Sequence, residues 1–326
     1  MTTKTGLRAC IAMFASIVAS APAAAFAAES YPVRPIRMIV GFAPGGGTDL
    51  TARPVALKLS ELLGQQVIVE NRPGAAGNIA TEQVARAAPD GYTILMGTIA
   101  ALAINPSLYG NLTFDPETDF NPVIQVVDAT NVLVLHPSVP ANSVPELIRL
   151  AAHKSLSAGS SGVGATGHLA IELFNLMTGV KLVHVPYKGG GPAMTDLVGG
   201  QVQLIFATAA SAVPQIKAGR IKGIAVTTAR RSALMPDLPT LSEAGLTGFD
   251  ANNWYGIVVP ARTPRAIVDL LNAEVTKILN MPDVKAALFS QGLDPAPGTP
   301  EQFGAYIRSE RTKWAGVIKA SRAKAE

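Results

Sequence analysis

Short runs of β-branched and other apolar residues alternate with longer stretches of helical periodicity along most of the chain. The first unit places a predicted strand at residues 36–41 before a predicted helix at residues 48–63, with Thr48 as its N-cap and Gly64 as its end. Such alternation is typical of α/β proteins, in which helices cover both faces of a sheet. The pattern therefore predicts an α/β fold with mostly parallel sheets.

The alternation continues to the C-terminus. Further predicted strands lie at residues 67–70, 92–97, 157–160, 182–185, 203–207 and 255–259, and further predicted helices at residues 78–88, 144–154, 166–178, 192–198 and 210–218, from Pro264, and near Pro282 and Pro300. Two apolar runs, at residues 123–135 and 221–227, are long enough to pass between two lobes. Two crossings predict a two-strand hinge.

The first residues have the pattern of a secretory signal peptide. Lys4 and Arg8 precede an apolar stretch without acidic residues, and Ala25 and Ala27 form a small-residue cleavage motif. We predict that residues 1–27 are removed and that the mature protein is periplasmic.

The rest of the 326-residue chain is long enough for about two domains. Together with the two crossings, this length predicts a discontinuous first lobe at residues 28–128 and 227–326. The second lobe is predicted at residues 129–226.

Composition argues against several classes of site. The only cysteine, Cys10, lies in the predicted signal peptide, so a mature chain has no thiol for a disulfide or a metal. The chain has 27 basic and 23 acidic residues and no dense basic run, which gives nucleic-acid binding no electrostatic support. The four histidines lack metal-ligand spacing, and we predict neither a metal nor a cofactor.

A glycine-rich loop at residues 41–49 follows the first predicted strand and precedes a helix. Its three consecutive glycines allow backbone N–H groups to turn toward one point, where the positive end of the helix also favours an anion. The loop lacks the Gly-Lys-Ser/Thr ending of a nucleotide-binding P-loop. Asp49 lies in the first helical turn, where capping of the helix is its expected role.

A second loop, at residues 160–168, has the same position between a strand and a helix. It contains a G-x-G-x-x-G pattern, but the next predicted strand runs into Pro186 without the acidic residue that a dinucleotide site needs. The hydroxyl groups of Ser160, Ser161 and Thr166 fit a carboxylate better than a pyrophosphate.

The same loop allows an enzymatic alternative, a hydrolase with Ser160 or Ser161 as nucleophile and His168 as base. The G-x-S-x-G motif of such enzymes is incomplete here, because Val163 stands at the last glycine position. We therefore favour a protein that is not an enzyme.

A third loop carries Tyr187 and Lys188 at the end of a predicted strand. Ligands of open α/β sheets bind at the carboxyl ends of strands. Lys188 is therefore a candidate countercharge for an acidic ligand, and Tyr187 a candidate wall of its site.

Several stretches in this order together resemble the Bug-type solute receptors of tripartite tricarboxylate transporters. They are YPVRPI at residues 31–36, FAPGGGTD at 42–49, VENRPGAAGN at 69–78, APDGY at 88–92 and VPYKG at 185–189. The resemblance implies a two-lobed periplasmic-binding fold, type II-like, that closes around a carboxylate and delivers it to two membrane subunits.

By position, the resemblance implies a set of ligand-binding residues: Phe42, Gly45, Gly46, Gly47, Asp49, Thr98, Ala100, Ser160, Gly162, Gly164, Thr166 and His168, with Tyr187 and Lys188 nearby. The loop arguments add Thr48 and Ser161. One departure from the family is Pro54 inside the first predicted helix, where it removes a backbone hydrogen bond and is expected to kink the helix.

The leading hypothesis is a monomeric receptor for a mono- or dicarboxylate, an amino acid or an aromatic acid. A signalling receptor for the same ligands fits the sequence almost as well, and the hydrolase is the remaining alternative. We also expect Trp254, just before a predicted strand, to lie near the cleft.

Overall fold

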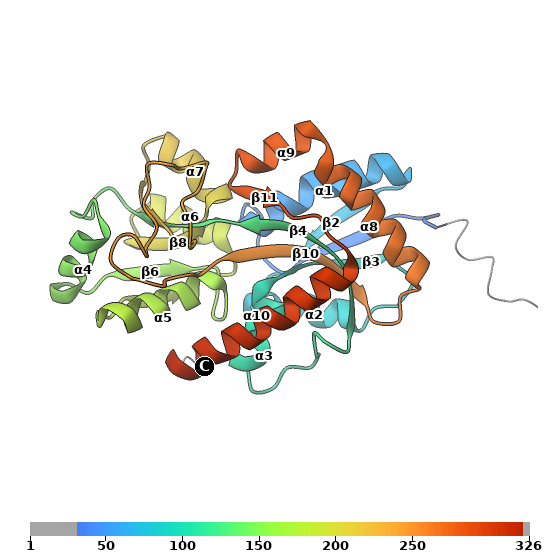
Figure 1. Cartoon of the computed structure of the whole chain (residues 1–326), viewed down its shortest axis with the longest axis horizontal. Helices are drawn as coiled ribbons and strands as arrows, with labels where there is room; N and C mark the ends of the chain where they lie inside the picture. Colours follow the sequence, from blue (N-terminus) through green and yellow to red (C-terminus); the bar gives the residue numbers. More distant parts are fainter. Residues whose placement is uncertain (1–30, 322–326) are drawn as a thin grey trace, which may run out of the picture. The chain divides into compact units, whose positions relative to one another are not determined.

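The computed structural model describes residues 31–321, so the predicted signal peptide and its cleavage site lie outside the described part. The described chain forms two sheets with helices on both faces (Figure 1). None of the helices in this part is both long enough and apolar enough to cross a membrane.

The first sheet has the strand order β11-β4-β10-β3-β1-β2. Helices α1, α8 and α9 lie on one face, and α2 and α10 on the other (Figure 1). The elements are β1 Ile36–Val40, α1 Gly47–Leu63, β2 Val67–Asn71, α2 Asn78–Ala85, β3 Thr93–Thr98, a π-helix Ala100–Ile104, α3 Asn105–Leu108, β4 Phe120–Ala129, β10 Asn253–Pro260, α8 Arg265–Asn280, α9 Pro282–Phe289, β11 Leu293–Pro295 and α10 Pro300–Ser321.

The second sheet has the strand order β7-β6-β8-β5-β9. Its elements are β5 Asn131–Leu135, α4 Val144–His153, β6 Ser157–Ser160, α5 Thr166–Thr178, β7 Val183–Pro186, α6 Gly190–Val198, β8 Leu204–Thr208, α7 Ala209–Lys217 and β9 Lys222–Val226. Strand alternation sends Val132 and Val134 toward the core under α6 and α7, and Leu133 and Leu135 toward the core with α5.

The α/β prediction is confirmed, and both sheets are mixed, with most strands of each sheet running in one direction. Strands β1, β2 and β3 run parallel, whereas β10 is antiparallel to β3 and β4. In the second sheet β5 is antiparallel to β8 and β9. The reason is the route of the chain. Strand β5 begins beside the end of β8, and β10 begins beside the end of β3. Each of them therefore runs opposite to that neighbour.

The two connections between the sheets differ from the predicted crossings. The predicted strand at residues 123–135 divides at Thr130, with β4 in the first sheet and β5 in the second. The run at 221–227 is not a crossing, because β9 pairs with β5 in the second sheet. Residues 227–252 carry the chain back instead, and the N–H of Thr227 donates to the carbonyl of Asn131 at 3.0 Å.

Helix α1 begins one residue earlier than predicted. Gly46, with φ −86° and ψ 167°, is the N-cap, so the prediction of Thr48 as the cap is wrong. Glycine fits this extended position at the approach to the helix. The helix continues through Pro54 to Leu63 and ends at Gly64, which has φ 65°. Helix α2 ends at Ala85, three residues before its predicted end.

The carboxyl group of Asp128, in β4 of the first sheet, is expected to make the stability of the protein depend on pH. Burial raises the pKa of Asp128 to about 6, and the nearby Asp294 and Glu310 add to the rise, although Gln125 donates a hydrogen bond to its Oδ1. A folded-state pKa above the ordinary value means that stability is lost as the pH rises from about 4 to about 6.

We therefore expect Asp128→Asn to raise the free energy of unfolding by about 1–3 kcal/mol at pH 7.5. The gain should shrink toward zero near pH 4, where the wild-type carboxyl is protonated. Urea denaturation at several pH values measures both effects. Asp237→Asn, at an exposed position, is the control. A gain for Asp128→Asn that does not depend on pH would contradict this account.

Candidate functional site

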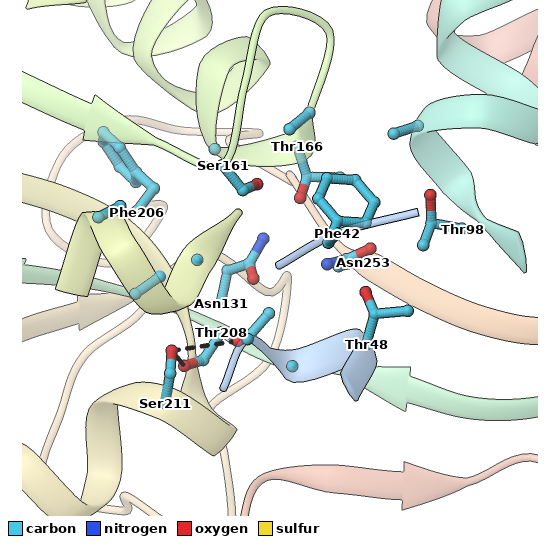
Figure 2. Close-up of a pocket in the computed structure, with 18 of the residues that line it drawn as sticks. Phe42, Thr48, Thr98, Asn131, Ser161, Thr166, Phe206, Thr208, Ser211 and Asn253 are labelled. Carbon is cyan, nitrogen blue, oxygen red and sulfur yellow. Dashed lines mark hydrogen bonds between the residues drawn. The ribbon is translucent and has the colours of Figure 1, made fainter. Parts of the chain in front are cut away.

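A cavity lies between the two sheets and is lined by residues of both (Figure 2). Its volume for the centre of a water-sized sphere is about 50 Å³, enough for several water molecules. The lining consists of small, hydroxyl-bearing, amide and aromatic residues: Phe42, Gly46, Gly47, Thr48, Thr98, Ala100, Asn131, Ser161, Ala165, Thr166, Gly167, Gly190, Ala193, Ile205, Phe206, Ala207, Thr208, Ser211, Asn253 and Tyr255.

The first turns of four helices contribute to this lining. They are α1 through Thr48, α5 through Thr166, α6 through Gly190 and α7 through Ser211. The N–H groups of a first helical turn have no partner inside the helix, and the helix dipole places partial positive charge there. The cavity is therefore an environment that favours negative charge.

Among the described residues, the lining contains no charged side chain. Its polar groups are neutral hydroxyl groups and amides, and Figure 2 shows those of Thr48, Ser161 and Thr166 around the ring of Phe42. An anion here would be held by hydrogen bonds and helix ends, without an ion pair.

The start of β10 forms part of the lining. The Nδ2 group of Asn253 donates to the hydroxyl oxygen of Tyr255 at 3.0 Å, and Asn253 Oδ1 accepts from the N–H of Trp254 at 2.9 Å. Burial raises the pKa of Tyr255, so its phenol remains a neutral hydrogen-bonding group. Trp254 points to the opposite face, where it packs on Phe303, and its predicted place near the cleft is wrong.

The predicted site residues divide into two groups. The structure brings eight of them together around the cavity: Phe42, Gly46, Gly47, Thr48, Thr98, Ala100, Ser161 and Thr166. The others lie behind or beside its lining: Gly45, Asp49, Ser160, Gly162, Gly164, His168, Tyr187 and Lys188.

Asp49 supports the first loop from behind. Its Oδ2 atom accepts from the Gly45 N–H at 3.1 Å and from Arg53 at 2.9 Å, and its Oδ1 atom accepts from Asn71 at 2.9 Å. Asn71 also donates to the carbonyl of Phe42 at 2.9 Å. Burial acts to raise the pKa of Asp49, but these hydrogen bonds outweigh it and lower the pKa. The carboxylate therefore holds the loop in place as an anion.

Two histidines support the second loop in a similar way. His168 and His184 stack with ring centroids 4.2 Å apart. The Nδ1 atom of His168 accepts from the N–H of Gly164 at 3.1 Å, and His184 Nε2 lies 2.6 Å from the hydroxyl of Ser160. That hydroxyl also accepts from the N–H of Gly162 at 3.1 Å. Burial lowers the pKa of both imidazoles to about 4, so both are neutral near pH 7.

This arrangement does not match the Ser160 form of the hydrolase hypothesis. Ser160 is fully buried and contacts His184, whereas the hypothesis pairs a serine with His168. The separation follows from the fold, because Ser160 ends β6 and is in register with Pro186 of the neighbouring strand that carries His184.

The third loop lies beside the cavity. The hydroxyl of Tyr187 donates to Asp196 at 2.6 Å, and burial together with this carboxylate raises the pKa of Tyr187 to about 12. Lys188 is exposed. Both residues line a neighbouring groove, which shares Phe42 and Ser161 with the cavity.

Residues 51–322 match the family model of the tripartite tricarboxylate transporter family receptor. The chain belongs to this receptor family. Protein BugT of Bordetella pertussis is 37% identical to the receptor over 323 residues, which cover 98% of each chain.

Solved structures agree with this assignment and with the two-sheet α/β fold. The structure titled R. palustris Rpa4515 with adipate is 38% identical, with a TM-score of 0.88 over 90% of this chain and 99% of that one. MatC from Rhodopseudomonas palustris with bound malate is 32% identical, with a TM-score of 0.85 over 88% of this chain and 100% of that one. The predicted resemblance to the Bug-type receptors is confirmed.

Sequence reasoning missed several residues that line the cavity of the receptor: Asn131, Phe206, Thr208, Ser211, Asn253 and Tyr255. Thr208 ends β8, so the rule that ligands bind at carboxyl ends of strands could have found it. Asn131 and Asn253 instead begin antiparallel strands. No signal for them exists until the strand directions are known.

Across residues 31–321 of the receptor, no group of three or more histidine, cysteine, aspartate or glutamate side chains is arranged to hold a metal ion.

The hydrogen bonds of Asp49 behind the first loop are expected to stabilise the receptor. Asp49→Ala leaves the Gly45 N–H without its acceptor, removes the partner of Arg53 and takes away one of the two acceptors of the Asn71 amide. We therefore expect a loss of about 2–4 kcal/mol in the free energy of unfolding. Thermal or urea denaturation measures the loss. The control is Glu61→Ala, which removes an exposed ion pair with Lys58 on the same helix and should cost less than about 0.5 kcal/mol. Equal losses for both variants would contradict the supporting role of Asp49.

Proposed function

We propose that the chain is a periplasmic receptor that captures a small carboxylate between two lobes and delivers it to two membrane subunits of a tripartite tricarboxylate transporter. The observation that carries the proposal is the convergence of four helix N-termini on a cavity whose described lining contains no charged side chain. Family membership and the adipate and malate bound to its structural relatives support a carboxylate as the ligand.

The lobes are proposed at the predicted boundaries, residues 28–128 with 227–326, and residues 129–226. The distribution of strands supports this division, because the first sheet takes its strands from the first set and the second sheet from the second, to within one residue at Ala129. Closure of the lobes is the proposed working step. A ligand drives closure only through contacts that it makes better in the closed state.

Catalysis is not part of the proposal. Ser160 is buried behind the loop and bonded to His184, and the matching family is a receptor family. Export after cleavage near Ala27 and function as a monomer complete the proposal. N-terminal sequencing of the exported protein and light scattering test these two points.

The ligand is tested by native mass spectrometry of freshly purified protein, followed by calorimetric titration with malate, succinate, adipate, glutamate and nicotinate. Binding of at least one acid is expected. A tightly bound natural ligand without any carboxylate would overturn the proposed function. Uptake of the acid into vesicles that hold the two membrane subunits, dependent on added receptor, tests the transport role against signalling.

The hydroxyl of Thr166 in the first turn of α5 gives the sharpest test of the site. If it donates to a charged oxygen of the ligand, Thr166→Ala should weaken binding by about 1–3 kcal/mol without altering the unliganded melting temperature by more than a few degrees. Thr312→Ala removes an exposed hydroxyl from α10 and should bind like the unmodified protein. Unchanged affinity for Thr166→Ala would place the ligand elsewhere.

A further inference from the structure

Two short glycine-rich segments, one from each proposed lobe, meet at one side of the cavity. The first is the turn at residues 44–46 before α1, and the second is the run at residues 189–191 at the start of α6. The N–H of Ala43 donates to the carbonyl of Lys188 at 3.0 Å, which is a backbone hydrogen bond between the residues that directly precede the two segments.

Lack of side chains is what allows this contact. A Cβ atom on Gly191 would overlap the carbonyl oxygen of Pro44, and one on Gly189 would lie 2.8 Å from the nitrogen of Ala43. A Cβ on Gly46 would come within 3.3 Å of the nitrogen of Gly190. The two backbones are therefore packed directly against each other. Residues with a Cβ atom at these positions could not approach so closely.

The contact lies between the cavity and a neighbouring groove, and Ser211 lines both. Gly46 and Gly190 line the cavity, whereas Pro44, Gly45 and Gly191 line the groove. Separation of the two segments would join the cavity to that groove.

We propose that residues 44–46 and 189–191 form a backbone latch, which sets ligand affinity by controlling closure of the lobes. This inference rests on the proposed function, because it assumes that a ligand is enclosed by closure. Gly191 is the informative position, since it lies outside the cavity lining and its fit to Pro44 matters only when the two segments meet.

Gly191 also allows closure to be separated from folding. It lies in the first turn of α6, and its φ is not in the left-handed region, so alanine fits the local backbone. Alanine stabilises helices relative to glycine. Gly191→Ala should therefore leave the unliganded melting temperature unchanged or raise it, while the clash with Pro44 opposes closure. A variant that was merely less stable would instead lose both melting temperature and the ability to close.

The test without ligand is disulfide cross-linking across the latch. The substitutions Ala43→Cys and Lys188→Cys, in a chain carrying Cys10→Ser, give a pair that can be oxidised to a disulfide only while the segments are in contact. The rate of cross-linking therefore reports the closed population. Gly191→Ala should slow the reaction by about 10-fold or more, given the usual cost of an added methyl group in a packed contact. Gly316→Ala in α10, where a Cβ meets nothing within 4 Å, should not change the rate.

The test with ligand is calorimetric titration with whichever of malate, succinate, adipate, glutamate or nicotinate binds the unmodified protein. Gly191→Ala should weaken binding by about 10- to 100-fold, and Gly316→Ala should not. Cross-linking of Gly191→Ala at the unmodified rate would overturn the latch, whether or not an acid binds. Failure of every acid to bind the unmodified protein would count instead against the proposed function.

Discussion

The two connections between the sheets are hydrogen-bonded to each other, and the position of the cavity depends on these bonds. The N–H of Thr227 donates to the carbonyl of Asn131, and the N–H of Ala251 donates to the carbonyl of Thr227 at 3.1 Å. The hydroxyl of Thr227 adds a bond to the carbonyl of Ala251 at 2.9 Å. All three residues are buried, where unpaired backbone groups would be costly. Asn131 lies at the first of these connections and Asn253 directly after the second, and both line the cavity.

The route of the chain also explains which parts of the site the sequence predicts. Glycine-rich loops after β1 and β6 are recognisable because each follows an apolar strand and precedes a helix, and they supply Phe42 and Thr166 to the cavity. Asp49 and His168 belong to the same loops but support them from behind. Residue type and spacing cannot separate these roles, since only the packed structure determines which side of a loop faces the ligand. The mixed direction of the strands was equally hidden, because apolar periodicity is the same for parallel and antiparallel strands.

Neutrality of the cavity has an energetic meaning. A buried lysine or arginine would be left as an unpaired charge whenever the ligand left, at a cost of several kcal/mol. Hydroxyl groups such as those of Thr48 and Ser161, and the N–H groups of helix ends, can bind water in the absence of ligand and an anion in its presence. The free-energy difference between the empty and the occupied site is therefore smaller than it would be with a charged side chain. Such a site suits a carrier, which must both hold its ligand and release it.

The latch is made of backbone and glycine, whereas the walls of the cavity are made of side chains such as Phe206, Ala193 and Ser161. Substitutions in the walls change the size and polarity of the space without entering the contact between Pro44 and Gly191. Gly46 and Gly190 belong to both the latch and the lining, but the contact between Pro44 and Gly191 is separate from the walls that select the ligand. A duplicated gene for such a receptor could acquire a new nutrient through a few wall mutations while its moving parts stayed unchanged, which is a favourable starting point for evolutionary diversification.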